Sequence, residues 1–506
     1  MSQKYPIGIQ SFEEIRTGNF LYIDKTEYVY QLVEGSKAYF LSRPRRFGKS
    51  LFVNTIEALF QGKEDLFKGL FIEDKWNWAE TNPVIKISFS NIDHKEIGLS
   101  KAIKIELRSL AKKNGFELES ESNGLMFREL IETIYKKHGK VVVLLDEYDK
   151  PIIDYLGKDI NIALENQDIL KGLYSILKDA DDYLRMVFIT GVSKFSRVSI
   201  FSDLNNLMDL TINDSYAGIC GITQIELENN FQEELKLYDN DKIKSWYNGY
   251  SWSLKTKVYN PFSLLNFFRD NGKFRNYWFA TGTPTFLINL SKDKHLVNFE
   301  NIEISETSLE AYRIDNIQLI PLMFQTGYLT IKDIDPDTNI YTLDYPNQEV
   351  RSAFLENLAN NYVQNSEDEQ SVILALQISK SLKVGNLEKV HQILNTLFKS
   401  IPYTLWQKES EHFYHAIIHL IFKLLGIYVD SEVQTSDGRM DALVRLEKYV
   451  YCFEFKLDES AEMALEQIEK KGYLTPYLHQ GRTCIGIGVN FSKEEKKVKE
   501  FLWKEF

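Results

Sequence analysis

Residues 41–51 read LSRPRRFGKSL, and the end of this stretch, Gly48-Lys49-Ser50, has the form of a phosphate-binding loop. The sequence predicts an apolar strand just before it, at residues 38–41, and an amphipathic helix just after it, at residues 51–60. In such a loop, backbone N–H groups face the phosphates, the lysine reaches the β- and γ-phosphates, and the serine hydroxyl binds Mg²⁺. The residues that we predict to contact ATP in this stretch are Arg46, Phe47, Gly48, Lys49, Ser50 and Leu51.

The loop departs from the full motif at one position, because Arg43 stands where a glycine is expected. On its own, the stretch is also compatible with an ordinary helix start. A second element favours nucleotide binding: residues 141–145 form an aliphatic strand that runs into Asp146 and Glu147. We predict that Asp146 holds Mg²⁺ together with Ser50, and that Glu147 polarises the attacking water.

A third predicted strand, residues 185–190, ends at Thr190 and runs into a polar loop. In ATPases of this class a polar side chain at this strand end contacts the γ-phosphate or its water, so Thr190 or Ser193 is the candidate. Arg197 is a candidate for stabilising charge on the phosphates. The alternative is a strand that simply continues into a polar loop.

The surrounding sequence alternates strands with helices. The expected strands are residues 38–41, 84–89, 141–145 and 185–190, and residues 51–60 and 100–111 are among the helices between them. Strands this apolar, separated by helices, predict a parallel sheet covered on both faces. The fold class is therefore α/β, with a P-loop parallel-sheet ATPase domain.

A second group of polar residues lies near the C-terminus. From residue 397 the predicted order is helix, three strands (428–434, 440–446 and 449–456), helix, strand, helix. Asp441 opens the second strand, and Glu454 and Lys456 share one face of the third because side chains alternate along a strand. Two carboxylates and a lysine on one sheet face predict a phosphodiester-cleaving site, in which Asp441 and Glu454 bind Mg²⁺ and Lys456 acts on the attacking water. Repulsion between the two carboxylates predicts that the pKa of one of them rises.

Several readings stay open around this trio. Exposed strand faces often carry Glu and Lys as cross-strand ion pairs with no chemical role. On the preceding helix, Glu411 and His415 share a face and are candidates to support a bound metal, and His415 with His419 is a weaker zinc pair. The alternative for these histidines is burial in an amphipathic helix.

The combined motifs resemble those of the bacterial AAA-ATPase-like family that carries a C-terminal PD-(D/E)XK nuclease-like domain. The resembling stretches are YIDKT (22–26), RPRRFGKS (43–50), DEYDKP (146–151), TGVSK (190–194), WYNGY (246–250), YNPFS (259–263) and TGTP (281–284). The resemblance implies an ATPase domain and a nuclease-like domain, and it makes Arg43 an ordinary feature of the loop. Gln467 and Tyr473 resemble polar positions of related nucleases, although their spacing does not match the known form.

The composition limits the class of protein. The net charge of −12 argues against a passive polycation that coats nucleic acid, but it is compatible with an acidic metal site. No stretch is long and apolar enough for a membrane helix, and we expect no membrane partner. The three cysteines are scattered, and the N-terminus lacks the pattern of a secretory signal, so we expect a cytoplasmic protein.

We predict four parts: a P-loop AAA-ATPase-like domain (1–223), a mostly helical middle region (224–346), a helical linker (347–396) and a PD-(D/E)XK nuclease-like domain (397–506). The leading hypothesis is an ATP- and Mg²⁺-dependent enzyme acting on nucleic acid, more on DNA than on RNA. The rival is an ATP-operated switch or scaffold whose C-terminal domain binds a partner without cleaving it. A third reading is a nucleotide-binding protein without turnover, and a homo-oligomer is left open.

Overall fold

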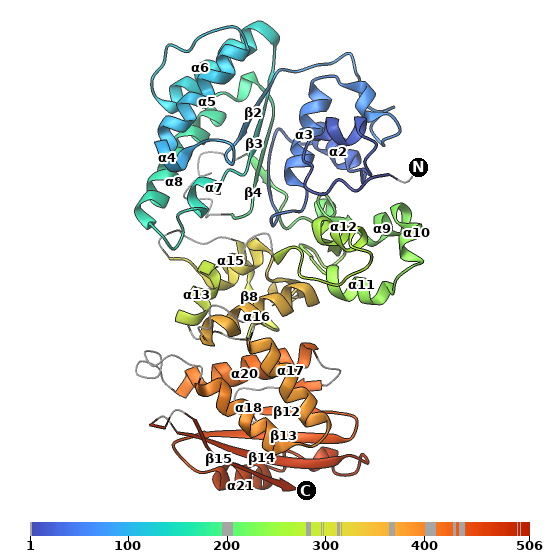
Figure 1. Ribbon diagram of the computed structural model, residues 1–506. Coiled ribbons are helices and arrows are strands. Elements are labelled where there is room, and N and C mark those ends of the chain that lie inside the picture. The colour runs from blue at the N-terminus through green and yellow to red at the C-terminus, as the bar shows by residue number, and fades with distance from the viewer. Residues whose placement is uncertain are drawn as a thin grey trace. The chain divides into compact units, whose positions relative to one another are not determined.

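The structure is a computed structural model of the chain, shown in Figure 1. It divides into two compact units, which we describe separately: Met1–Gly282 with Phe299–Val350, and Thr283–Asn298 with Arg351–Phe506. The residues that the structure describes are 3–194, 206–279, 285–294, 296, 298–310, 314, 316–363, 370–399, 411–428, 432–434, 441–492, 494–495 and 497–506.

The first unit is organised by a five-stranded sheet of order β2-β3-β4-β1-β5, in which every neighbouring pair is parallel. Its strands are β1 (Ala38–Ser42), β2 (Val84–Ser88), β3 (Val141–Asp146), β4 (Leu184–Gly191) and β5 (Leu207–Asp209). The first four match the predicted strands, and the parallel sheet is confirmed. The short edge strand β5 was not predicted, because three residues carry too little pattern to be recognised.

Helices cover both faces of this sheet (Figure 1). The helix α3 (Lys49–Phe60) lies on one face, and α5 (Leu99–Lys113), α6 (Asn123–His138) and α8 (Ile160–Asp179) lie on the other. The remaining helices of this part are α1 (Phe12–Thr17), α2 (Thr26–Glu34), α4 (His94–Ile97) and α7 (Lys150–Ile153). Because β1, β3 and β4 are parallel, their carboxyl ends meet at one edge, where the predicted nucleotide residues that the structure describes lie.

The middle region is mostly helical, as predicted, but it also contains a sheet that was not predicted. Its helices are α9 (Gln224–Asn230), α10 (Gln232–Leu235), α11 (Asn240–Tyr247), α12 (Pro261–Arg269), α14 (Glu306–Glu310) and α15 (Leu319–Thr326), and α16 (Gln348–Val363) begins just after this region. The strands β8 (Ile302–Ser305), β9 (Thr330–Asp335) and β10 (Ile340–Asp344) pair antiparallel in the order β8-β10-β9, and β6 (Ile222–Thr223) pairs with β7 (Val258–Tyr259).

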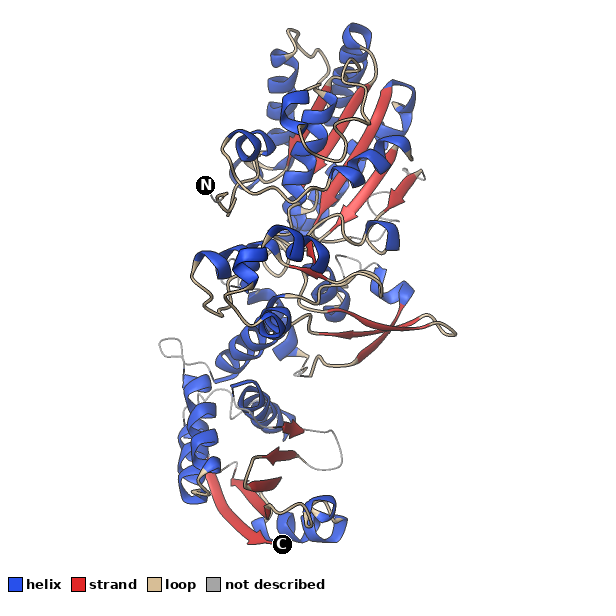
Figure 2. Ribbon diagram, turned by 90° about the vertical axis from the view of Figure 1, so that its right-hand side faces the viewer, coloured by secondary structure: helices blue, strands red, loops and turns tan. Residues whose placement is uncertain are grey.

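The second unit contains a five-stranded mixed sheet of order β11-β12-β13-β14-β15, in which only β13 and β14 are parallel (Figure 2). The strands are β11 (Glu432–Gln434), β12 (Ala442–Arg445), β13 (Tyr449–Leu457), β14 (Thr483–Ser492) and β15 (Lys497–Glu505). The helices are α13 (Thr285–Asp293), α17 (Gln370–Lys383), α18 (Leu387–Lys399), α20 (Glu411–Tyr428) and α21 (Ala461–Lys471). Figure 1 shows α21 on one face of this sheet and α17, α18 and α20 on the other.

The last predicted helix of the chain is wrong, because residues 497–505 form the strand β15. The buried side chains of this segment, Val498 and Phe501, are three residues apart, which resembles a helical period. A register shift between Asn490 and Phe491 of β14 leaves one residue of β15 without a partner. This bulge lets a strand bury two side chains at an odd spacing.

The stretch predicted as a linker contains α17 and α18, which pack in the second unit. The Tyr451 hydroxyl of β13 donates to the Leu382 carbonyl at 2.8 Å, and the Val498 N–H of β15 donates to Asn395 Oδ1 at 2.8 Å. These bonds tie both helices to the C-terminal sheet. The four-part division of the chain stays a prediction.

Among the described residues, no helix combines the length and the apolar character that crossing a bilayer requires.

Candidate nucleotide and metal sites

Arg43 replaces the expected glycine by serving as a buried support for the loop. Its side chain is fully buried, and Nη1 donates to the carbonyls of Ser42 (2.8 Å) and Thr211 (2.9 Å). Nη2 donates to the Tyr216 carbonyl at 3.3 Å, and the guanidinium lies 4.1 Å from the ring centroid of Trp252. The arginine therefore fixes the start of the loop, where a glycine would leave it free to move.

The loop itself presents backbone N–H groups without partners. Among the described residues, none of the N–H groups of Arg46, Phe47, Gly48, Lys49, Ser50 and Leu51 has a hydrogen-bond acceptor. Arg46 and Gly48 adopt left-handed backbone conformations, with φ of 68° and 95°. Left-handed residues turn successive N–H groups to one side, and the N-terminus of α3 adds positive potential there. This arrangement is suited to binding an anion.

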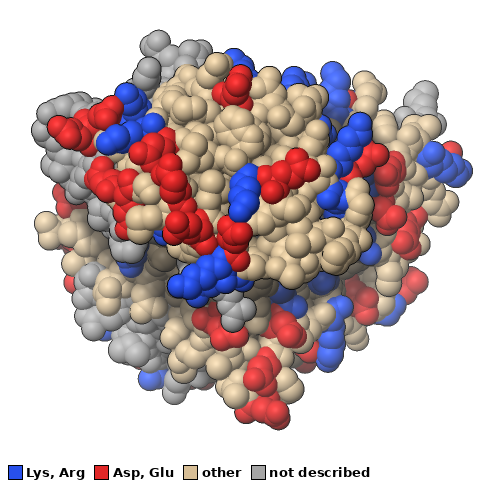
Figure 3. Space-filling view, turned by 90° about the horizontal axis from the view of Figure 1, so that it is seen from below, with Lys and Arg blue, Asp and Glu red and all other residues tan. Residues whose placement is uncertain are grey.

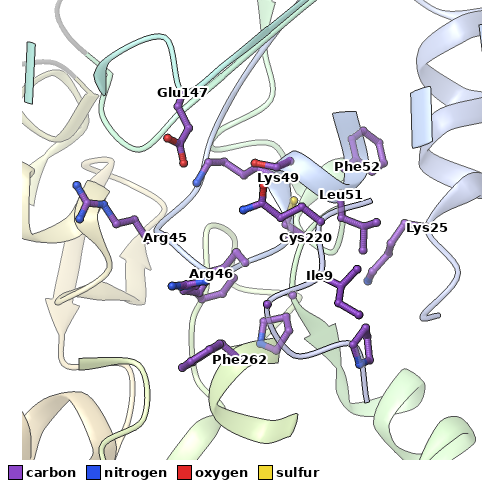
Figure 4. A pocket seen from close by; sticks show the side chains of 18 of the residues that line it. Ile9, Lys25, Arg45, Arg46, Lys49, Leu51, Phe52, Glu147, Cys220 and Phe262 are labelled. Carbon is purple, nitrogen blue, oxygen red and sulfur yellow. The ribbon is translucent and has the colours of Figure 1, made fainter. Parts of the chain in front are cut away.

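A cavity of about 500 Å³ lies beside the loop. Of the predicted nucleotide residues, those that line it are Arg46, Phe47, Gly48, Lys49, Ser50, Leu51 and Glu147. Residues 6–10 and 219–222, together with Phe262 and Leu265, line it as well, and sequence reasoning gave none of them a role. Figure 4 shows Lys49 and Glu147 directed into the same space, and Arg46 alongside Phe262, 5.0 Å from its ring centroid.

Lys49 is bound to the loop in this structure. Its ammonium donates to the carbonyls of Arg43 (2.8 Å) and Pro44 (3.0 Å). Burial lowers the pKa of Lys49, whereas the nearby carboxylates of Asp146 and Glu147 act in the opposite direction. A triphosphate in the cavity would offer this ammonium stronger, charged acceptors.

Asp146 and Thr190 lie behind the cavity and bond to each other. The Thr190 hydroxyl donates to Asp146 Oδ1 at 2.5 Å, and neither residue lines the cavity. Ser193, the other candidate at this strand end, is buried, and Arg197 lies outside the described residues. The structure thus places Thr190 beside the predicted Mg²⁺ ligand, so it can orient that carboxylate.

Asp149 is a site residue to which sequence reasoning assigned no role. Its Oδ2 accepts from the N–H groups of Val192 (2.9 Å) and Ser193 (2.5 Å), and burial raises its pKa to about 6. The Tyr148 hydroxyl donates to the Ser193 carbonyl at 3.0 Å. These bonds fasten the loop after β3 to the end of β4, and they hold Glu147 in a left-handed conformation (φ 53°). The sequence did offer a sign of this role, because Asp149 is the third acidic residue of the stretch DEYD (146–149).

Restoring the usual glycine at position 43 should weaken the fold. We expect Arg43→Gly to lower the free energy of unfolding by about 2–4 kcal/mol, because buried carbonyls lose their donors and a cavity forms. Arg46→Gly is the matched control: Arg46 is exposed and left-handed, so glycine should change stability by less than about 1 kcal/mol. Thermal unfolding of the full chain measures both. Equal stability of the two variants would contradict the supporting role of Arg43.

The C-terminal trio comes together on neighbouring strands. Ala442 of β12 pairs with Phe453 of β13, so Asp441, which immediately precedes β12, lies one register position further on, beside Glu454. Asp441 Oδ2 accepts from the Phe455 N–H at 2.7 Å, which fixes its carboxylate at the strand. Lys456 Nζ lies 3.6 Å from Glu454 Oε1.

Gln467 of α21 joins two members of the trio. Its Oε1 accepts from Lys456 Nζ at 2.8 Å, and its Nε2 donates to Glu454 Oε1. Tyr473 resembles a polar position of related nucleases, as Gln467 does, but it packs against the apolar cluster that contains Leu443, Cys452 and Ile468. The sequence named Gln467 by its resemblance to a polar position of related nucleases, and the structure places its side chain between Glu454 and Lys456.

Glu454 has the environment of a metal ligand. It is only 4% exposed, and its Oε2 is buried without a hydrogen-bond partner among the described residues. Burial, followed by the charge of Asp441, raises its pKa to about 7. A buried carboxylate oxygen without a donor is costly unless a cation compensates it, so Asp441 and Glu454 fit a divalent metal.

The further metal candidates lie on the helix before the trio, α20. The side chains of Glu411 and His415 lie outside the described residues, and that of His419 is half-buried. Within the described part of the chain, no group of three or more His, Cys, Asp or Glu residues is arranged to hold a metal ion. The metal site that we consider therefore rests on two carboxylates.

Metal affinity at this site should depend on pH through Glu454. A carboxyl with a pKa of about 7 is mostly protonated at pH 6 and mostly ionised at pH 8, and only the ionised form binds metal. We therefore expect Mn²⁺ to bind the full chain about tenfold more weakly at pH 6 than at pH 8. Calorimetric titration at both values measures this. An affinity independent of pH would contradict the raised pKa or the role of Glu454 as a ligand.

Comparison with known proteins identifies the relatives of both units. Residues 6–201 match the family described as predicted AAA-ATPase, and residues 409–501 match the PD-(D/E)XK nuclease superfamily. An uncharacterized protein in the vnfD 5′ region of Azotobacter chroococcum mcd 1 is 39% identical over 99% of this chain and 98% of its own length. The chain belongs to the bacterial AAA-ATPase-like family with a C-terminal PD-(D/E)XK domain. Membership in this family confirms the resemblance and the α/β fold class predicted from the motifs.

Two solved structures are more distant. The Aeropyrum pernix ORC1 protein in complex with DNA is 13% identical, with a TM-score of 0.25, over 65% of this chain and 90% of that one. The Aeropyrum pernix ORC2 protein, with ADPNP and ADP, is 12% identical, with a TM-score of 0.29, over 89% of this chain and 92% of that one. TM-scores this low establish no shared fold.

The surface carries both signs of charge. On the face seen in Figure 3, Lys and Arg side chains are interspersed with Asp and Glu. Any contact with a polyanion on this face would therefore depend on a few local cations.

Proposed function

We propose that this family member hydrolyses ATP in its first unit and cleaves nucleic acid, DNA in preference to RNA, with Mg²⁺ in its second unit. The proposal is supported above all by Asp441, Glu454 and Lys456, which lie together with a buried, partnerless carboxylate oxygen. A scaffold that only binds a partner has no need of this costly trio.

In the first unit, the free N–H groups of the loop would bind the phosphates, and Lys49 would exchange its loop carbonyls for phosphate oxygens. Ser50 and Asp146 would hold Mg²⁺, with Thr190 orienting the Asp146 carboxylate. Glu147 would accept a proton from the attacking water, because it lines the cavity beside Lys49.

In the second unit, Asp441 and Glu454 would hold Mg²⁺, which, when bound, supplies positive charge at the scissile phosphate. Gln467 keeps Glu454 and Lys456 in fixed positions through its two hydrogen bonds. Lys456 would orient the attacking water or neutralise the charge that develops on the phosphate.

The test is direct. The full chain is incubated with labelled single- and double-stranded DNA and RNA, with Mg²⁺ or Mn²⁺, with and without ATP. We expect metal-dependent cleavage of DNA. Metal binding without cleavage of any of these substrates would favour the ATP-operated switch.

The three cysteines, Cys220, Cys452 and Cys484, are all free and buried. We propose a reducing compartment, the cytoplasm, on this basis.

A further inference from the structure

The phosphate loop is held by residues far outside the matched ATPase segment. The indole Nε1 of Trp278 donates to the Arg45 carbonyl at 3.0 Å, across 233 positions of sequence. On the same loop, the Phe47 carbonyl accepts from the Gly221 N–H at 3.1 Å. Both carbonyls are thus directed at elements outside the loop.

The direction of a carbonyl fixes the direction of the next N–H. In a planar trans peptide, C=O and N–H point to opposite sides, so an Arg45 carbonyl held by Trp278 directs the Arg46 N–H the other way. Arg46 is left-handed (φ 68°), a conformation that is unfavourable for a non-glycine residue. The surrounding structure must therefore hold this peptide in place.

Trp278 is well anchored for this role. Its backbone N–H donates to the buried carboxyl of Glu349 at 2.7 Å. Its ring lies 5.1 Å from that of Tyr328 and 6.3 Å from that of Tyr250. Tyr250 in turn packs 4.8 Å from Phe47 of the loop. The indole is therefore a fixed donor facing a loop that lacks the first glycine of the usual motif.

We propose that Trp278 is a positioning residue of the nucleotide site, whose indole N–H holds the Arg45 carbonyl so that the Arg46 N–H faces the phosphates. The inference rests on the proposed nucleotide binding. It adds that the binding loop of this chain is completed by a residue from the middle region.

The test removes the indole N–H together with one ring of the buried indole. Trp278→Phe keeps an aromatic ring beside Tyr328 and Tyr250 but loses the bond to Arg45. We expect ATP and ADP to bind about three- to tenfold more weakly, the value of one hydrogen bond. The KM for ATP should rise with kcat unchanged, because ground and transition states lose the same contact. The melting temperature should fall, because the buried side chain loses one ring and leaves a cavity, so binding is measured at a temperature at which the variant is fully folded.

Trp78→Phe is the matched control. Trp78 Nε1 donates to the Glu73 carbonyl at 2.8 Å, and neither residue lines the cavity. The same substitution there removes the same kind of bond and should leave nucleotide affinity unchanged. If both variants lose affinity equally, the effect is general and the inference is wrong.

Two further variants keep the outcomes distinct. If Trp278→Phe binds nucleotide as tightly as the wild type while Lys49→Ala does not bind, Trp278 has no positioning role but the loop binds ATP. If Lys49→Ala also binds normally, the prediction that this loop binds nucleotide is wrong.

Should Trp278→Phe fail to fold, benzothienylalanine at position 278 keeps the bicyclic shape and replaces N–H by sulfur. Full affinity of that variant would overturn the inference, and a three- to tenfold loss would support it.

Discussion

Asp441→Ala and Glu454→Ala should each abolish metal binding in the second unit and, with it, all cleavage. The two carboxylates are neighbours, and Glu454 Oε2 has no hydrogen-bond partner among the described residues. Removing either carboxylate halves the set of charged ligands. Because metal binds the folded state, the wild type should gain thermal stability with Mn²⁺, and both variants should lose this gain.

Lys456→Ala should separate binding from chemistry. Metal binding should survive, since a competing cation 3.6 Å from Glu454 is removed, while cleavage should fall by at least about 100-fold. Calorimetric titration with Mn²⁺ and a cleavage assay on each variant provide the measurement. Glu469→Ala is the control in the same unit, because its exposed pair with Lys504 should contribute little. Wild-type protein that binds no metal would exclude the nuclease mechanism.

Lys49→Ala should abolish ATP binding, and Glu147→Gln should preserve binding while hydrolysis falls by at least about 100-fold. Lys49 is the buried cation of the loop itself, whereas Lys25, which is also buried at the cavity, is paired with Glu226. Loss of Lys49 therefore leaves the phosphates without their main charged partner. The glutamine retains the shape of Glu147 but cannot accept the proton of the attacking water.

Labelled-nucleotide binding and phosphate release measure the two effects separately. Lys68→Ala, at an exposed position paired with Asp65, is the control and should match the wild type. Hydrolysis by Glu147→Gln at the wild-type rate would mean that another group activates the water. Asp149, which also lines the cavity, would be the next candidate.

The sequence predicted the central sheet well because its strands are short apolar runs between helices. Residues 141–145, for example, are all fully buried, so their composition alone determines the strand. The strand β15 was mistaken for a helix because a bulge changes the spacing of its buried side chains. The spacing of apolar residues along the sequence therefore predicts regular helices and strands, and it fails where a strand departs from regular pairing.

The candidate sites were predictable where one short segment supplies the chemistry, as at Gly48-Lys49-Ser50 or at Glu454 and Lys456. Trp278 could not be predicted, because its bond to Arg45 depends on how distant segments pack. The role of Arg43 was similarly hidden, since its acceptors at Thr211 and Tyr216 lie more than 160 positions away. A single sequence contains no local sign of such partners.

The helices α17 and α18 have a practical consequence for work with the nuclease-like part alone. A fragment cut at residue 397, or at the start of the matched segment, would strip these helices from the sheet. It would uncover the face around Tyr451 and Phe501, which His391 of α18 now covers with its ring 5.1 Å from that of Phe501. An apolar sheet face laid open in this way tends to aggregate, so inactivity of such a fragment would say nothing about the enzyme. A fragment that begins at residue 351 keeps this cover and lacks only Thr283–Asn298 of the second unit.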